Sequence, residues 1–260
     1  MDLPERRVSL AGRAAFPESA PPVTTQTKPI DLYYAATPNG RKITIMLEEL
    51  GVPYTVHPIS ISRGDQFTPE FLAISPNNKI PAIVDPEGPD GAPISIFESG
   101  AILKYLAEKF GRFYGSSWAE RVKIDEWLFW QVGGFGPMLG QANHFARYAK
   151  EKIPYAIERY LNETHRLYRV LDTQLGKQAA AGRDYVAGAD VSIADFAILD
   201  WSNGYVTYAV NEAEFPHWAA WRDRMLARPG TARALAFKLP ETPVDLAKDD
   251  AAQKVLFGQR

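Results

Sequence analysis

The sequence predicts a two-part protein, a small α/β unit followed by a larger unit made only of helices. Between residues 30 and 112, short apolar runs with strand character alternate with segments of helical spacing. After residue 116 only helical spacing is found. We therefore expect an α/β domain at residues 30–112 and an all-α domain at 116–238, with a flexible arm at 1–29 before them and a loose, charged tail at 239–260 after them.

The α/β part follows the order β-α-β-α-β-β-α. Its first helix starts at the Thr37–Gly40 turn and ends before Gly51, because glycine tolerates the positive φ found at helix ends. A short second helix opens with Thr68 as its cap and Pro69 at its first position. Since strands connected through a helix run parallel, the sheet should be partly parallel. The predicted strands are 30–34, 54–61, 81–84 and 94–97, and the third helix is 99–110.

The all-α part contains one clear capping motif. Ser192 and Asp195 form a capping box, in which each side chain bonds the backbone N–H of the other residue. We interpret this motif as structural rather than catalytic. The other helices predicted in this part are a long one over 116–147, one starting at Pro154, one starting at Pro216 and a short one at 231–237.

Composition excludes several classes of function. The chain has 29 basic and 31 acidic side chains and a net charge of −2, so there is no electrostatic reason to expect nucleic acid or a membrane as partner. No apolar run reaches the ~18 residues of a membrane-spanning helix. The 260 residues include no cysteine, which excludes disulfides, cysteine metal sites and a cysteine nucleophile, and fits a cytoplasmic protein. The four histidines lack metal-ligand spacing, so no metal is expected.

Two stretches indicate a binding site for a small peptide-like anion. The turn at 77–80 ends in the Ile80–Pro81 bond, which can be cis at low cost and would then turn backbone polar groups outward. Glu98 and Ser99 stand at the start of a helix, where free N–H groups favour a carboxylate. Taken alone, the same residues are equally typical of a plain turn and a helix cap.

Five stretches resemble the cytosolic glutathione transferases, and more narrowly the Nu-class bacterial disulfide-bond reductases related to the fungal nitrogen regulator. The likeness covers roughly residues 30–238 and implies a thioredoxin-like N-terminal domain, a helical C-terminal domain and a homodimer. The stretches at 75–83 and 97–102 are typical of the superfamily, and the others are typical of the subgroup. The five stretches are 37–43, 75–83, 97–102, 127–141 and 153–160.

The resemblance assigns the glutathione contacts residue by residue. Ile80 would pair with the cysteinyl backbone, Glu98 with the γ-glutamyl ammonium and Ser99 with the γ-glutamyl carboxylate. Charge-assisted hydrogen bonds of this kind are worth about 1.5–3 kcal/mol. The remaining implied contacts are Asn39, Gln66, Lys79, which would pair with the glycyl carboxylate, and Arg159.

Three of these contacts have simpler interpretations. Lys79 is also typical of a solvated turn lysine, and Gln66 of a loop amide. Arg159 is spaced to form an exposed ion pair with Glu163, one helical turn later.

Catalysis by glutathione requires its thiolate, and a free thiol has a pKa near 8.5. Thr37 and Asn39 occupy the loop where most glutathione transferases carry the activating group, so both are candidate catalytic residues. Their hydrogen bonds and the helix N-terminus would favour the thiolate. The alternative is a simple turn and helix cap. Tyr33 and Tyr34 are weaker candidates because strand residues of this kind are usually packed.

The absence of cysteine shapes the expected reaction. Thiol–disulfide exchange needs an attacking and a resolving thiolate, so both must come from glutathione, the co-substrate. The expected substrate is a small-molecule disulfide, with a peroxide as a second possibility. Alternatives are conjugation of glutathione to electrophiles, or a non-catalytic glutathione-binding regulator.

The glycine-rich stretch 133–137 should kink the long helix, because Pro137 lacks the N–H that would bond Gly133. One interpretation is that the kink opens a path beside the glutathione site. The other is close packing of helices or subunits.

Overall fold

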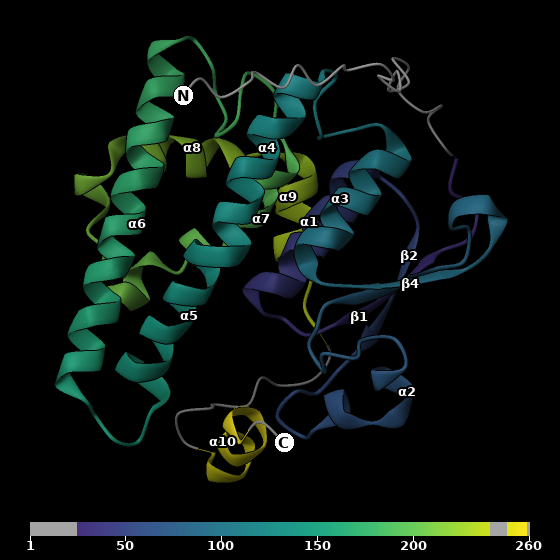
Figure 1. Cartoon of the computed structure of the whole chain (residues 1–260), viewed down its shortest axis with the longest axis horizontal. Helices are drawn as coiled ribbons and strands as arrows, with labels where there is room; N and C mark the ends of the chain where they lie inside the picture. The colour runs from purple at the N-terminus through teal and green to yellow at the C-terminus, as the bar shows by residue number, and fades with distance from the viewer. Residues whose placement is uncertain (1–24, 240–248, 259–260) are drawn as a thin grey trace, which may run out of the picture.

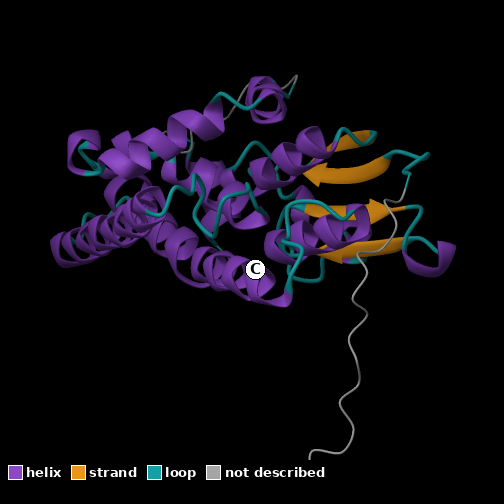
Figure 2. Cartoon of the chain, turned by 90° about the horizontal axis from the view of Figure 1, so that it is seen from above, coloured by secondary structure: helices purple, strands orange, loops and turns teal. Residues whose placement is uncertain are grey.

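The computed structural model describes residues 25–239 and 249–258. The strands gather at one end of the molecule and the long helices at the other, as the two views show (Figure 1, Figure 2). The predicted fold class, an α/β part followed by an all-α part, is therefore confirmed. Within the described residues, no helix combines the length and apolar character needed to cross a membrane.

A mixed four-stranded sheet forms the centre of the first part. Strand β1 pairs in parallel with β2 and antiparallel with β3, which pairs antiparallel with β4. The predicted second strand is too long, because Ser60 begins a turn in which its N–H is bonded by the Asp65 carboxylate, 2.8 Å away. The order across the sheet is β2-β1-β3-β4, and the strands are β1 (Ile30–Tyr34), β2 (Tyr54–Pro58), β3 (Ala82–Asp85) and β4 (Ile94–Phe97).

Helices cover both faces of the sheet. α1 and α3 pack against each other above it in Figure 1, and α2 lies below it. Thr37 caps α1 by accepting a hydrogen bond from the Gly40 N–H at 3.2 Å, and Gly51 ends the helix with φ 72°. The helices of this part are α1 (Pro38–Leu50), α2 (Pro69–Leu72) and α3 (Ser99–Phe110), with short 3₁₀ turns at Asp65–Phe67 and Pro89–Gly91.

The second part is a bundle of helices. Helix α6 is its longest element and lies beside α5 (Figure 1). Short 3₁₀ turns at Tyr205–Tyr208 and Glu212–Glu214 join α7 to α8. The helices are α4 (Trp118–Trp130), α5 (Gly136–Asn143), α6 (Pro154–Ala180), α7 (Ile193–Ser202), α8 (Pro216–Leu226), α9 (Pro229–Ala236) and α10 (Asp250–Phe257).

The glycine-rich stretch is a wide helical turn rather than a break. The π-turn η3 (Gln131–Phe135) joins α4 to α5, and the Gly136 N–H donates to the Gln131 carbonyl five residues earlier. A π-turn adds one residue to the helix and so accommodates the missing N–H of Pro137. A second π-turn, η4 (His144–Tyr148), follows α5.

Asp195 holds α7 in place. Its carboxylate is fully buried and accepts from the Ser192 N–H, the Val186 N–H and Trp221 Nε1 at 2.9–3.0 Å. Burial raises the pKa of this carboxyl, and the hydrogen bonds oppose that shift. The predicted capping box is confirmed.

The two ends of the chain differ from the prediction. The tail was expected to be loose, but residues 250–257 form α10, because Asp249 caps the Ala252 N–H and Phe257 packs on His144 and Tyr148. Residues 240–248 lie outside the described residues. Most of the expected arm, 1–24, also lies outside them, but Gln26 is buried and donates to Asp85 at 3.1 Å.

Helix α1 is shared by both parts. It packs against α3 on one side and against α7 and α9 on the other. At its C-terminal end the buried carboxylate of Glu49 binds Arg228 at 2.6 Å and the Thr231 N–H at 3.0 Å. Burial raises the pKa of Glu49, but the hydrogen bonds from Arg228 and Thr231 outweigh it, so the pKa lies below its usual value. The ion pair therefore stabilises the joint between the two parts at neutral pH.

We expect Glu49→Gln to lower the free energy of unfolding by about 2–3 kcal/mol, because it leaves Arg228 partly buried without its carboxylate. Urea denaturation at pH 7 measures this loss. Because the folded pKa is lowered, the stabilisation is present above the unfolded pKa and is lost as pH falls toward the folded value. The difference between variant and wild type should therefore shrink in acid. Glu70→Gln, at an exposed position of α2, is the control.

Candidate functional site

The N-terminus of α1 carries two polar side chains whose orientations are set by neighbours. The Thr37 hydroxyl oxygen accepts from the Gly40 N–H. Trp201 of α7 donates from Nε1 to Asn39 Oδ1 at 2.8 Å. Since an indole N–H can only donate, it binds the carbonyl oxygen of Asn39 and directs the amide NH₂ group away from α7. Asn39 therefore presents a fixed donor at the start of the helix.

A second set of polar groups comes from the turn before β3 and the start of α3. The Ile80–Pro81 bond is cis, which is the form that the sequence allows at low cost. Asn77 Nδ2 donates to Glu98 Oε1 at 3.4 Å, and so links this turn to the start of α3. The structure thus brings the two stretches singled out in the sequence side by side.

Glu98 and Ser99 differ sharply in environment. Glu98 is exposed and adopts φ 71°, an uncommon value for a residue with a side chain. Such outliers are concentrated at functional sites. Ser99 is the first residue of α3 and is only 7% exposed. Its N–H belongs to the first helical turn, where backbone donors lack intrahelical partners and favour an anion.

A buried lysine lies directly behind Ser99. Lys42 of α1 is 1% exposed, and its Nζ donates to Ser99 Oγ at 3.1 Å and to Gln131 Oε1 at 2.6 Å. Burial lowers the pKa of Lys42 to about 7, and the nearby charge of Glu98 opposes that shift. Lys42 was not among the residues predicted from the sequence. The signal was available, since Ile45 and Met46, three and four residues later, place it on the apolar face of α1.

The other predicted contacts are more scattered. Gln66 is buried and donates from Nε2 to the Ile61 carbonyl at 3.1 Å, while its Oε1 has no hydrogen-bond partner among the described residues. The side chain of Lys79 is exposed, and its carbonyl accepts from the Ser75 hydroxyl at 2.8 Å. Neither residue is joined to Ser99 by a contact in the described part of the chain.

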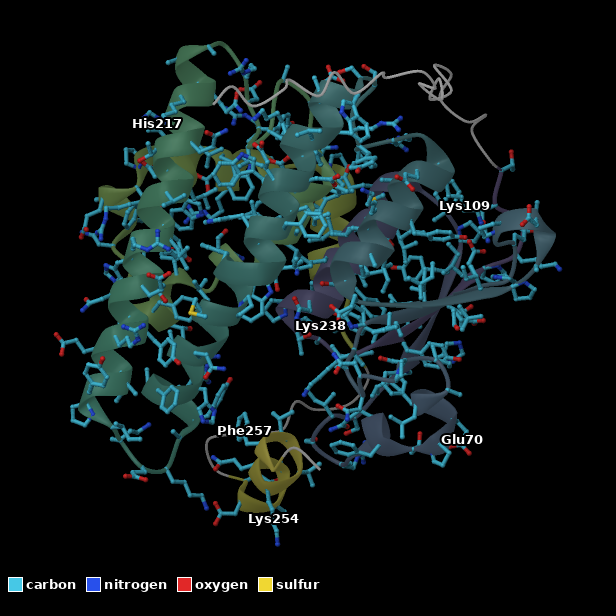
Figure 3. All side chains as sticks on the ribbon, viewed as in Figure 1. Glu70, Lys109, His217, Lys238, Lys254 and Phe257 are labelled. Carbon is cyan, nitrogen blue, oxygen red and sulfur yellow. The ribbon has the colours of Figure 1, made fainter. Side chains whose placement is uncertain are left out.

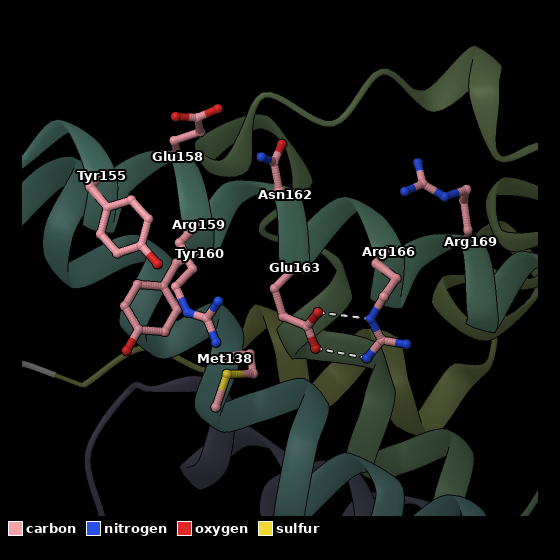
Figure 4. Close-up of a pocket in the computed structure, with 9 residues that line it drawn as sticks. All are labelled: Met138, Tyr155, Glu158, Arg159, Tyr160, Asn162, Glu163, Arg166 and Arg169. Atoms are coloured by element: carbon pink, nitrogen blue, oxygen red, sulfur yellow. Dashed lines mark hydrogen bonds and ion pairs between the residues drawn. The ribbon is translucent and has the colours of Figure 1, made fainter.

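Arg159 lies on the outer face of α6, in a pocket of about 720 Å³ (Figure 4). The predicted alternative, an ion pair of Arg159 with Glu163, is wrong. Glu163 is instead bound by Nε and Nη2 of Arg166 at 2.7 Å, and Arg159 acts on its carboxylate only through its charge (Figure 4). Arg159 remains a cation in a pocket that it shares with Tyr155, Tyr160 and Arg169, among others.

Tyr33 and Tyr34 pack against other side chains, as expected for strand residues, which is why they were weaker catalytic candidates than Thr37. Tyr34 is fully buried, and burial raises its pKa. Tyr33 stacks on His57, and its pKa is raised by burial and by Asp31. A raised pKa makes a phenol a weaker proton donor to a thiolate, so neither tyrosine suits thiol activation.

Glycines in and after the π-turn make room for Trp201. A methyl group at Gly136 would lie 2.7 Å from Gln131 Nε2 and 3.4 Å from the Trp201 ring, and one at Gly140 would lie 3.4 Å from the same ring. Of the two interpretations of the stretch 133–137, Gly136 supports close packing, whereas a methyl group at Gly133 or Gly134 would meet nothing within 4 Å among the described residues. Because Trp201 orients Asn39, this packing bears on the site. Trp201, like Lys42, was missed in the sequence, where it is one of six tryptophans.

Helix α10 connects the two parts beside Gln66. Phe257 stacks edge-on against His144 and tilts over Tyr148, both from η4. On the side of the α/β part, a methyl group at Gly64 would lie 3.6 Å from Val255. Figure 3 shows Phe257 on the upper side of α10 and Lys254 on the opposite side. Within the described residues, no group of three or more histidine and acidic side chains is arranged to hold a metal.

Comparisons with known proteins bear on these features. The model of the glutathione S-transferase N-terminal domain matches residues 36–109, and that of the C-terminal domain matches residues 143–229. The disulfide-bond oxidoreductase YfcG of Escherichia coli is 51% identical over 207 residues, which cover 79% of this chain and 94% of YfcG. The chain belongs to the glutathione transferase family.

Solved structures of this family agree with the fold. A glutathione transferase family member from Pseudomonas fluorescens, with two glutathione bound, is 44% identical with a TM-score of 0.74 and covers 79% of this chain and 92% of its own. A glutathione transferase from Pseudomonas putida, with one glutathione disulfide bound per subunit, is 41% identical with a TM-score of 0.75 and covers 82% of this chain and 92% of its own. The predicted family is thus confirmed.

We expect Phe257→Ala to release α10 from η4, because its ring supplies the stacking contacts with His144 and Tyr148. Limited proteolysis with trypsin should then cut after Lys254 several times faster, as judged by mass spectrometry. Val206→Ala, at an exposed position of the Tyr205–Tyr208 turn, is the control. Equal cleavage rates in all three proteins would show that Phe257 does not hold the helix.

Proposed function

We propose that this chain is a glutathione-dependent disulfide-bond oxidoreductase that draws both reacting thiols from glutathione. The main support is a polar helix end without any cysteine in the chain, set beside a cis-proline turn and the start of α3. Such a site can bind a thiol-bearing peptide and stabilise its thiolate, but it cannot supply a sulfur atom. The name of YfcG supports this reaction class, and the glutathione or glutathione disulfide bound to the solved relatives supports glutathione as the co-substrate.

In the proposed complex the backbone of Ile80 pairs with the cysteinyl unit of glutathione. Glu98 binds the γ-glutamyl ammonium, and the hydroxyl and N–H of Ser99 bind the γ-glutamyl carboxylate. This division fits the exposed carboxylate and the donor-rich helix start. Lys79 reaches the glycyl carboxylate, and the free Oε1 of Gln66 accepts an N–H of the ligand. Arg159, in its own pocket, serves the second glutathione.

Thr37 and Asn39 stabilise the thiolate. The Thr37 hydroxyl oxygen accepts from the Gly40 N–H, so its own hydrogen is available to the sulfur. The Asn39 amide offers a second donor, oriented by Trp201. With the positive end of α1, these groups favour the charged form of sulfur and lower the pKa of the bound thiol.

The reaction then balances in two exchanges. The first glutathione thiolate attacks one sulfur of the substrate disulfide, a new sulfur–sulfur bond forms, and one substrate thiolate leaves. A second glutathione thiolate attacks the glutathione sulfur of this mixed disulfide and releases the other substrate thiolate. The two leaving thiolates take up protons, the substrate is reduced, and two glutathiones become glutathione disulfide. Reduction of a peroxide by the same thiols is a side activity of this proposal.

The proposed working form is a homodimer in the cytoplasm. Support for a dimer comes from α4, where Trp118 and Phe129 are exposed large apolar side chains. Support for the cytoplasm comes from the chemistry, since glutathione is kept reduced there.

Conjugation of glutathione to electrophiles uses the same thiolate, so a parallel assay with an aryl halide and a disulfide separates the two activities. A non-catalytic regulator would bind glutathione without turnover in either assay.

Removing the thiolate donors should slow turnover of a small disulfide. We expect Thr37→Ala and Asn39→Ala each to lower kcat/KM by about tenfold to a hundredfold, since a hydrogen bond to a charged group is worth about 1.5–3 kcal/mol. Thr37→Ser keeps the hydroxyl and should stay near wild type. The alanine variant also loses the helix cap, which costs about 1 kcal/mol of stability, so urea denaturation of each variant separates a loss of folding from a loss of catalysis. Undiminished rates in both alanine variants would remove this catalytic assignment.

Trp201→Phe tests the orientation of Asn39. The variant keeps a ring against Gly136 and Gly140 but loses the indole N–H, so the Asn39 amide is free to turn. We expect the pKa of the bound thiol, followed by thiolate absorbance in the ultraviolet, to rise, and kcat at neutral pH to fall about threefold to tenfold. Trp127→Phe, which replaces a half-buried indole of α4, should change neither quantity. An unchanged thiol titration in Trp201→Phe would contradict the role.

A further inference from the structure

Lys42 is unusual because its buried ammonium has two neutral partners. Its Nζ is bonded to the Ser99 hydroxyl and to the Gln131 amide oxygen, at 3.1 and 2.6 Å. Lys109, a second deeply set lysine, is paired with the buried carboxylate of Asp85 at 2.5 Å. A buried charge without a counter-ion is costly, and proteins usually avoid it. The site at Lys42 therefore lacks one negative charge.

The charged groups around Lys42 do not supply that charge by contact. Glu98 acts on it from the start of α3, but this carboxylate is exposed and its hydrogen bond goes to Asn77. The acidic and basic groups on the other elements packed against α1 are engaged with each other. They are Arg41 with Asp200 of α7, and Glu49 and Glu48 with Arg228 and Arg233 around α9.

The hydrogen bond from Lys42 determines what Ser99 can do. An ammonium group has donors only, so Ser99 Oγ must accept from it. The hydrogen of the Ser99 hydroxyl is then free to point elsewhere. The N–H of Ser99 is also a free donor of the first helical turn. A charged Lys42 thus makes Ser99 a double donor, backed by a positive charge.

We propose that Lys42 is a positioning residue that acts through Ser99, and that it takes up a proton when the γ-glutamyl carboxylate of the ligand binds there. This inference rests on the proposed function, and it adds a proton to the binding reaction. The ligand carboxylate supplies the missing negative charge one hydroxyl group away from the ammonium. Gln131 in the π-turn holds the ammonium in line with Ser99 from the helical part of the protein.

The direction of the pH effect follows from the lysine. Burial lowers the pKa of Lys42 to about 7 without ligand, and a bound carboxylate raises it again. Below about pH 6 the lysine is charged in both states, so no proton is taken up. Between the two pKa values the ligand binds together with up to one proton, and its affinity falls as pH rises. From pH 7 to pH 8 the association constant should fall about threefold to fivefold.

Isothermal titration calorimetry with S-methylglutathione tests the proposal. This probe keeps both carboxylates and the ammonium but has no thiol to ionise, so thiolate formation cannot contribute protons. Titrations in buffers with different heats of ionisation count the protons exchanged. We expect an uptake of roughly half a proton at pH 7, where about half of Lys42 is neutral, and none at pH 5.5.

Two neutral replacements of the lysine assign the proton. In Lys42→Met and Lys42→Gln the proton uptake at pH 7 should disappear, and binding should weaken about tenfold or more. The glutamine variant can still donate a hydrogen bond to Ser99 or Gln131, so it provides the test if the methionine variant does not fold. Lys177→Met, at an exposed position in the last turn of α6, removes the same charge and should behave as wild type.

Three outcomes would overturn the proposal. Wild type could bind S-methylglutathione with no proton uptake at pH 7. A folded variant at position 42 could keep both the affinity and the proton count of wild type, in which case another group takes up the proton. If wild type does not bind the probe at all, the proposed function itself fails, and this result is distinct from the other two.

Discussion

The burial of α1 between the two parts of the molecule is the constraint on which the rest depends. One side of the helix meets α3, and the other meets α7 and α9. Because neither part can move without disturbing α1, groups at its start are held against groups from both parts. Asn39 is oriented by Trp201 of α7, and Lys42 reaches both Ser99 of α3 and Gln131 of the π-turn. The candidate site is thus a product of the interface between the parts.

The site combines donors of three kinds, and each has a separate structural origin. Backbone donors come from the start of α3, where Ser99 is the first helical residue. Side-chain donors come from Thr37 and Asn39 at the start of α1. The buried charge comes from Lys42, at the cost of desolvation. A peptide with two carboxylates and one thiol can place its anionic groups on these donors. Its ammonium can bind the exposed carboxylate of Glu98.

Local patterns predicted much of the fold. The order of strands and helices along the first part of the chain, the caps at Thr37 and Thr68 and the capping box at Asp195 follow from short-range chemistry, so they are readable without coordinates. The resemblance supplied the site residues, and the structure places Ser99 and Glu98 beside the turn at Asn77. The burial of Lys42 could be read from the apolar face of α1, but its hydrogen-bond partners and that of Trp201 could not, because they lie more than fifty residues away in the chain. The helix in the tail escaped prediction for the same reason, since it is held by aromatic contacts to η4.

Helix α10 joins the two parts of the protein near the C-terminal end of the described residues. It touches Gly64 in the loop next to Gln66, and it packs through Phe257 on Tyr148 in η4. These two attachment points belong to different halves of the protein, so the helix works as a clasp across them. A motion that moves the two parts away from each other must first break the contacts of α10 with one of them. The final turns of the polypeptide therefore help to set how often the interior opens to solvent.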